Sequence, residues 1–219
     1  MILTWYGHAC FKIVGSQSDA SLIIDPFEPS IGLKLPRFSA DILIETKDTP
    51  EYANREAVKG TRVQKPFLIA NPGEYEVGGV CVTAVLAEKK QKNKKGSPDR
   101  TLLVSVRLDD LTVCHLSDID RPLDERELDA LGRIDILLLP VGGGSTLDGV
   151  LATEVLNQIE PRIVIPMQYA LSGLKTTSAG VEGFLKEYGI KNPEKMDKLK
   201  IQKRDLPSEE TRVTLLDPA

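Results

Sequence analysis

Two short and almost uninterrupted apolar runs, residues 134–140 and 162–166, constrain the fold of this chain more than any other feature. A strand that is covered on both faces is apolar throughout, whereas a strand with one wet face alternates apolar and polar residues. Segments with helical spacing of apolar residues follow these runs at 146–158 and 178–188, and a third lies at 124–131. This alternation predicts a layered α/β fold in which helices cover the outside of a sheet.

The first half of the chain is predicted to form short, antiparallel strands joined by turns. We expect them at residues 2–6, 10–14, 21–25, 41–45, 66–71, 80–86, 101–107 and 111–115. The lysine-rich stretch 88–98 is a low-complexity segment, and its composition predicts a loop. No linker divides the chain, so we expect one domain over residues 1–219.

Charge and hydropathy exclude several classes of function. The net charge of -4 leaves no excess of Lys and Arg to displace counterions from phosphate, which argues against a general nucleic-acid binder. No apolar run approaches the roughly 20 residues that span a bilayer, so no membrane partner is expected. The N-terminus lacks the pattern of a secretory leader, which predicts a cytoplasmic protein. The cysteines, Cys10, Cys81 and Cys114, lie in apolar strands and are predicted to be buried thiols without a disulfide.

Seven segments form a pattern that is specific because of their order and spacing. They are TWYGHACFKI, LIIDPF, ADILIE, NPGEYEVGGVCVTAV, CHLSDID, IDILLLPVGGGSTLD and IVIPMQY, and together they cover the chain from residue 2 to about residue 190. In these segments the chain resembles the metallo-β-lactamase superfamily, and within it the small bacterial branch of predicted Zn-dependent hydrolases that is similar to ascorbate-6-phosphate lactonases. The resemblance implies a four-layer αββα sandwich with a metal site in loops at one edge of the sheets. Members of this superfamily often self-associate, so the resemblance is also compatible with a homo-oligomer.

The resemblance places a zinc-binding motif, His-x-His-x-Asp-His, in the loop after the strand at 41–45. Zinc takes such ligands because neutral imidazoles and a carboxylate on one short loop can converge on adjacent metal ions. In this chain Lys47 and Thr49 stand at the first two histidine positions. Glu51 replaces the aspartate and Tyr52 replaces the last histidine.

The other zinc-ligand positions that the resemblance implies also differ. No histidine stands near residues 87–89, the aspartate of the Gly-Asp motif is retained as Asp118, and Gln168 replaces the last histidine. The chain has two histidines in all, His8 and His115, and neither is a usual ligand in this family. A binuclear site built on imidazole is therefore impossible. We expect no cofactor, with the family's zinc absent, and no catalytic residue.

These positions are instead predicted to line a vestigial pocket that binds a small polar or anionic ligand. The pocket residues are Lys47, Thr49, Glu51, Tyr52, Asp118, Gln168 and His8. Because a buried carboxylate pair without its metal is costly, we predict that the Lys47 ammonium lies within about 3 Å of Asp118 or Glu51. In the alternative, Lys47 extends into water, and Asp118 only accepts hydrogen bonds from its own loop. A hard cation such as Mg²⁺ or Mn²⁺ could also bind between Glu51 and Asp118.

Three functions remain open from the sequence. The first is a fold that has lost its zinc ligands and acts as a non-hydrolytic binding or structural module. The second is a metal-dependent hydrolase with a rebuilt mononuclear or non-zinc site for a small ester, lactone or phosphate-bearing substrate, or with acid–base chemistry by Glu51 and Tyr52. The third is an anion-binding module, in which the glycine-rich turn 142–146 and nearby lysines bind a phosphate group. Those lysines are Lys89, Lys90, Lys92, Lys94 and Lys95.

Overall fold

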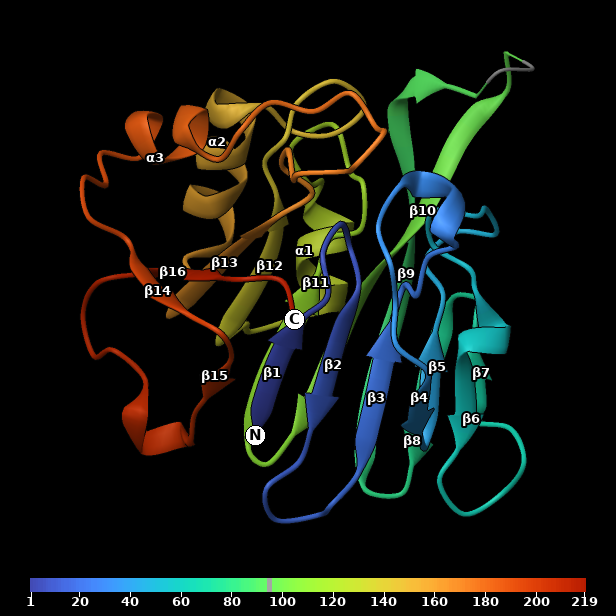
Figure 1. Cartoon of the computed structure of the whole chain (residues 1–219). Helices are drawn as coiled ribbons and strands as arrows, with labels where there is room; N and C mark the ends of the chain where they lie inside the picture. Colours follow the sequence, from blue (N-terminus) through green and yellow to red (C-terminus); the bar gives the residue numbers. More distant parts are fainter. Residues whose placement is uncertain (94–95) are drawn as a thin grey trace.

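The computed structural model describes residues 1–93 and 96–219, and two β-sheets packed face to face form its centre (Figure 1). The first sheet has the strand order β15-β1-β2-β3-β5-β7. Its strands are β1 (Ile2–Trp5), β2 (Phe11–Val14), β3 (Ser21–Ile24), β5 (Ile42–Ile44), β7 (Phe67–Ile69) and β15 (Leu199–Lys200). Every residue of β3 and β5 is buried, as expected for strands with both faces covered.

The second sheet has the strand order β14-β16-β13-β12-β11-β10-β9-β8. Its strands are β8 (Gly73–Val77), β9 (Val80–Lys92), β10 (Pro98–Leu108), β11 (Leu111–His115), β12 (Ile136–Pro140), β13 (Ile163–Met167), β14 (Glu194–Met196) and β16 (Arg212–Leu216). Strands β11, β12 and β13 are parallel, so their carboxyl ends meet at one edge of the sandwich. The two apolar runs that were predicted as buried strands are β12 and β13, and both are buried along their whole length.

Outer layers cover both sheets, which confirms the predicted αββα sandwich. Helices α1 (Glu125–Leu131), α2 (Gly149–Ile159) and α3 (Glu182–Glu187) pack on the second sheet through a cluster that includes Leu131, Val155 and Phe184. The layer over the first sheet consists of short 3₁₀ helices, η1 (Pro29–Ile31) and η2 (Arg55–Ala57), and the small sheet of β4 (Phe38–Ala40) and β6 (Val58–Gly60). A third 3₁₀ helix, η3 (Lys203–Asp205), lies before β16.

Two predictions about the secondary structure are wrong, one about strand pairing and one about the length of a helix. Strands β3, β5 and β7 pair in parallel, although the first half of the chain was predicted to be antiparallel. The physical reason is that residues 25–41 and 45–66 are long enough for crossover connections, which parallel neighbours require and hairpins do not. Helix α3 is also shorter than the predicted 178–188, because residues 178–181 form a loop that runs past the candidate site.

The lysine-rich stretch is strand rather than loop over most of its length. Strand β9 continues to Lys92, and its partner β10 begins at Pro98, which pairs with Lys92. An ion pair between Arg100 and Glu88, 2.6 Å apart, joins the two strands on their exposed side. Successive side chains of a strand face opposite ways, so Lys89 is buried while Lys90 is exposed. Lys94 and Lys95 lie outside the described residues.

Within the described residues, no helix is both long and apolar enough to cross a membrane. The three cysteines are free thiols. Cys10 and Cys114 are fully buried as predicted, whereas Cys81 is only half-buried. Cys114 packs on the helix side of the second sheet, and its neighbour His115 faces the other way, as successive residues of a strand must.

Candidate functional site

A pocket of about 990 Å³ lies where the carboxyl ends of β5, β11, β12 and β13 meet the turn between β1 and β2. All seven residues predicted for the vestigial pocket line it. Lys47, Thr49, Glu51 and Tyr52 follow β5, Asp118 follows β11, Gln168 follows β13, and His8 lies in the β1–β2 turn. The parallel strands place these loops side by side because equivalent ends of parallel strands share one edge.

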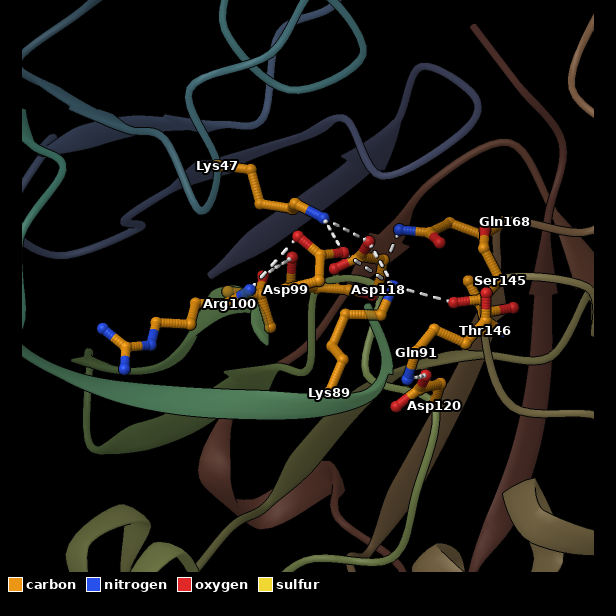
Figure 2. A network of polar contacts seen from close by, with 12 residues as sticks. Lys47, Lys89, Gln91, Asp99, Arg100, Asp118, Asp120, Ser145, Thr146 and Gln168 are labelled. Atoms are coloured by element: carbon orange, nitrogen blue, oxygen red, sulfur yellow. Dashed lines mark hydrogen bonds and ion pairs between the residues drawn. The ribbon is translucent and has the colours of Figure 1, made fainter. Parts of the chain in front are cut away.

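The centre of the pocket is an ion cluster that Figure 2 shows from close by. The Lys47 ammonium donates to Asp118 Oδ2 at 2.9 Å and to Asp99 Oδ2 at 2.8 Å. The Lys89 ammonium donates to the same Asp118 Oδ2 at 2.6 Å and to the backbone oxygen of Ser145 at 2.8 Å. One carboxylate oxygen thus accepts from two ammonium groups, and the side chains of both lysines are largely buried.

The predicted contact of the Lys47 ammonium with Asp118 or Glu51 is confirmed, and it is made to Asp118. Its second partner is Asp99, and no ion pair joins Lys47 to Glu51 within the described part of the chain. Burial alone would lower the pKa of Lys47, but the Asp118 charge and the hydrogen bonds to Asp99 and Asp118 outweigh it and raise that pKa. Burial likewise opposes the ionisation of Asp99, and the hydrogen bond from Lys47 and the lysine charges lower its pKa overall. Lys47 and Asp99 are therefore both charged at neutral pH.

The sequence did not indicate Asp99 or Ser178 as site residues. It placed Lys89 only among the lysines of the stretch 88–98, which was predicted to be a loop, and not beside Asp118. The signal that could have revealed Lys89 is its spacing: it lies two residues after the buried Ala87, on the same face of β9. Asp99 lies near the start of the partner strand β10, beside the end of β9, and so comes within reach of the same pocket.

A buried chain of hydroxyl groups holds the two loops that carry Lys47 and Asp118. Asp25 accepts from the Thr46 backbone N–H at 2.7 Å and from the Thr46 hydroxyl at 2.7 Å. The Thr46 hydroxyl also lies 2.6 Å from that of Ser117, which contacts the hydroxyl of Thr101. Burial raises the pKa of Asp25 well above its usual value, in spite of the hydrogen bonds from Thr46. This series of hydrogen-bonded hydroxyl groups fixes the residues immediately before Lys47 and Asp118.

Several residues around the pocket have left-handed backbones that a side chain adopts only at a cost. His8, Ser117 and Gln168 have φ angles of 50°, 50° and 58°. Such conformations persist where the surrounding structure imposes them, and they cluster at functional sites. Ser117 stands where the family resemblance implies glycine, the residue that tolerates this conformation best.

His115 supports the loop that carries Asp118. Its Nε2 lies 2.9 Å from the backbone oxygen of Ala9, and its Nδ1 accepts from the Ser117 N–H at 3.0 Å. Burial lowers its pKa to about 4, so the ring is neutral at physiological pH. It is a structural residue that links the β1–β2 turn to the loop of Asp118.

The side chains of Tyr52 and Gln168 hydrogen-bond each other, so they leave few polar groups free for a ligand. Gln168 donates to the Ser117 backbone oxygen at 3.1 Å, and its side chain also hydrogen-bonds the Tyr52 hydroxyl. The Lys47 ammonium lies 5.9 Å from the centre of the Tyr52 ring, within the range of a cation–π contact. Burial, with the nearby Asp118 charge second, raises the pKa of Tyr52 well above its usual value, so Tyr52 is not a base at neutral pH.

Three polar atoms of the pocket lining are buried without a hydrogen-bond partner in the part of the chain described. They are His8 Nδ1, Asp118 Oδ1 and Ser178 Oγ. Burial lowers the pKa of His8 to about 4, against the smaller opposing influence of Asp118 and Glu51, so this imidazole is neutral. Buried polar groups normally have a hydrogen-bond partner. Unpaired atoms concentrated in one pocket therefore indicate a missing hydrogen-bond partner there.

The glycine-rich turn 142–146 does not lead directly into a helix. Helix α2 begins at Gly149, beyond the turn, and the carboxylate of Asp148 already caps it by accepting from the Leu151 N–H at 2.9 Å. Within the turn, the N–H groups of Gly143 and Thr146 are bonded locally. A negative charge already occupies the helix start.

The donor set does not fit the zinc site that the fold family implies. Over residues 1–93 and 96–219, no group of three or more His, Cys, Asp or Glu side chains could hold a metal ion. A catalytic zinc normally takes three protein ligands. His8 and Asp118 supply only two unpaired donors, and two ammonium groups already contact Asp118.

A family model described as "Beta-lactamase superfamily domain" matches residues 2–168. The chain belongs to the metallo-β-lactamase superfamily. It is 30% identical over 186 residues to a UPF0173 metal-dependent hydrolase of Thermococcus onnurineus, covering 74% of this chain and 82% of the relative. It is also 30% identical over 212 residues to a UPF0173 metal-dependent hydrolase of Pyrococcus abyssi, covering 84% of this chain and 91% of the relative.

A solved structure from Thermotoga maritima supports the same membership. The protein is assigned to the Zn-dependent hydrolases of the metallo-β-lactamase superfamily, and it matches with a TM-score of 0.78 and 28% identity. The match covers 98% of this chain and 97% of that one. The recognition of this superfamily from the sequence is confirmed.

The expectation that this superfamily member uses no cofactor is wrong by the same comparisons. The relatives are named metal-dependent hydrolases, and the Thermotoga maritima protein is described as Zn-dependent. The expectation rested on the loss of histidines at the family's zinc positions, and a hard cation between Glu51 and Asp118 was kept only as an alternative. The function proposed for this chain therefore does not assume that a metal is absent.

Proposed function

We propose that this metallo-β-lactamase-fold chain is a binding module, in which the pocket around Lys47, Lys89 and Asp118 takes a small polar ligand without hydrolysing it. The observation that carries the proposal is the shared oxygen Asp118 Oδ2, which accepts from both ammonium groups at 2.9 and 2.6 Å. Both lysine amino groups already donate to Asp118, so neither is a free base or nucleophile. The same contacts hold Asp118 in place at the floor of the pocket.

The charge arrangement supports a binding role over acid–base chemistry by pocket residues. Tyr52 is buried and bonded to Gln168, and its pKa is raised. The neutral His8 has a pKa of about 4, too low for it to be an effective base at neutral pH. Because neither Tyr52 nor His8 is an effective base at neutral pH, these two groups orient a ligand through hydrogen bonds.

The second candidate is a metal-dependent hydrolase with a rebuilt site that acts on a small ester, lactone or phosphate-bearing substrate. The names of the relatives favour it, since each of the two UPF0173 relatives described above is called a metal-dependent hydrolase. Loss of the family's zinc ligands at positions 47, 49, 52 and 168 remains part of the first proposal and separates the two candidates.

A hydrolysis assay with the full chain distinguishes them. A lactone, an aryl ester and a phosphodiester are incubated with the protein, each with and without added Zn²⁺, Mn²⁺ or Mg²⁺. We expect no turnover above the buffer rate under any of these conditions. Metal-stimulated turnover that Asp118→Asn abolishes, and that the exposed-site control Lys195→Ala leaves unchanged, would establish the hydrolase and end the binding-module proposal.

The single domain over residues 1–219, the cytoplasmic location and self-association stay predictions from the sequence. Size-exclusion chromatography with light scattering tests the last of these directly.

A further inference from the structure

Most of the buried polar atoms without a partner in the described residues lie in one pocket. Among the described residues, five buried side-chain N or O atoms have no hydrogen-bond partner, and three of them belong to residues that line the 990 Å³ pocket: His8, Asp118 and Ser178. His8 and Asp118 are 5% and 4% exposed. A buried donor or acceptor without a partner costs about 1–3 kcal/mol, so a ligand that pairs these atoms would gain affinity.

We propose that the ligand is a neutral small molecule rich in hydroxyl groups, a sugar or polyol, held by His8 Nδ1, Asp118 Oδ1 and Ser178 Oγ. This inference rests on the binding role proposed above and names its ligand class. The first step is the chemistry of the three atoms. A carboxylate oxygen only accepts, a neutral imidazole nitrogen accepts or donates according to its tautomer, and a serine hydroxyl does both. A hydroxyl group also does both, so adjacent ligand hydroxyls can pair with all three.

The second step is the charge of the ligand. The lining holds three ammonium groups, Lys47, Lys89 and Lys92, and four carboxylates, Asp48, Glu51, Asp99 and Asp118. The two buried lysines already bond to carboxylates, at 2.6 to 2.9 Å. An anionic ligand would have to compete with Asp99 and Asp118 for these cations while facing two further carboxylates. A neutral ligand avoids this repulsion.

The third step is the direction in which the turn 142–146 presents its backbone oxygens. The Gly144 and Ser145 backbone oxygens accept from Gln91 at 2.7 Å and from Lys89 at 2.8 Å, so this turn presents acceptors toward β9. The Asp148 carboxylate occupies the start of α2. Around the pocket, the hydroxyls of Thr146, Thr176 and Thr177 add neutral polar groups of the kind that sugar hydroxyls pair with.

Two-dimensional ¹H–¹⁵N NMR titration of the full chain tests the ligand class. The neutral probes are D-glucose and myo-inositol, and the charged probes matched to glucose are glucose 6-phosphate and glucosamine. We expect saturable shifts of amide signals in the loops of His8, Asp118 and Ser178 with a neutral probe, and weaker binding of glucose 6-phosphate. Sugars also stabilise proteins non-specifically, because they are excluded from the protein surface. That effect does not saturate, so saturable shifts distinguish binding at the pocket from it.

Two variants connect the binding to the unpaired atoms. Ser178→Ala removes one partner and should weaken binding of the neutral probe about two- to tenfold, the effect of one hydrogen bond. Thr214→Val is the matched control, because the Thr214 hydroxyl is also buried and unpaired within the described residues but lies on β16, outside the pocket lining. It should leave binding unchanged.

Three results would overturn the inference: no saturable shift with either neutral probe, tighter binding of glucose 6-phosphate than of glucose, or equal binding by Ser178→Ala and the unmodified chain. Each leaves the outcome of the hydrolysis assay unaffected. Conversely, turnover in that assay would remove the non-hydrolytic role while the sugar titration stayed valid, so the two failures are distinguishable.

Discussion

Replacing Lys89 and Lys47 by methionine should reveal that the two lysines substitute for each other at Asp118. Lys89 is the more buried: its side chain is 2% exposed, that of Lys47 12% and that of Asp118 5%. Methionine keeps much of the length of lysine and removes its charge. In either single variant, one ammonium still neutralises the Asp118 carboxylate.

The expected magnitudes follow from what remains around Asp118. Each single variant keeps one cation beside Asp118, so its loss should be that of an ordinary hydrogen bond, about 0.5–1.5 kcal/mol of unfolding free energy. The double variant leaves a buried carboxylate without a cation, and removing the partner of a buried charge costs about 3–5 kcal/mol in all. We therefore expect the double variant to lose more than the sum of the two single losses. Adding Asp118→Asn to the double variant should recover much of the loss.

Urea unfolding followed by tryptophan fluorescence measures these values, because Trp5 is the only tryptophan and is fully buried. The double-mutant cycle gives the coupling energy between Lys47 and Lys89. Lys92→Met is the control, since Lys92 lies on the same strand and is exposed, and its effect should stay within about 0.5 kcal/mol. Strictly additive losses, or a Lys89→Met variant as stable as the unmodified chain, would refute the shared-carboxylate reasoning.

Three further predictions concern the frame of the pocket. His8 and His115 have folded-state pKa values of about 4, below the usual 6.5, so the stability they contribute is complete above pH 6.5 and is lost as pH falls toward 4; urea midpoints between pH 7 and 4 should fall, and an imidazole NMR titration of His115 near 6.5 would contradict this. Thr46→Val removes the hydroxyl that donates to Asp25 and should cost about 1–3 kcal/mol in urea unfolding; an unchanged midpoint would show that the bond contributes nothing. Asp148→Ala removes the cap of α2 and should lower stability by about 1 kcal/mol, measured the same way, whereas no loss would mean that water caps the helix equally well.

The parts of the fold that depend on local pattern were predictable, and the parts that depend on pairing were not. The apolar runs that became β12 and β13, and the helix that starts after Asp124, carry signals within a few residues of themselves. Parallel pairing of β3 with β5 depends on which distant segments meet, and the sequence of one strand does not encode it.

The same distinction between local and long-range information applies to the residues of the site. Lys47 could be placed beside Asp118 because the charge of a buried carboxylate requires a cation. Lys89 could not, because its composition is that of a solvated loop and only the length of β9 carries it inward. The partnership of Asp99 with Lys47 in place of Glu51 depends on how the ends of β9 and β10 approach the loop after β5, which no spacing in the sequence specifies.

A crystal structure of the full chain at pH 7 tests the central claim, that two lysines of the protein hold the carboxylate at the floor of the pocket, most directly. We predict that Nζ of Lys47 and Nζ of Lys89 both lie within about 3 Å of Asp118 Oδ2. Lys47 extended into solvent, or Lys89 turned away, with a different group bound to that oxygen, would contradict it.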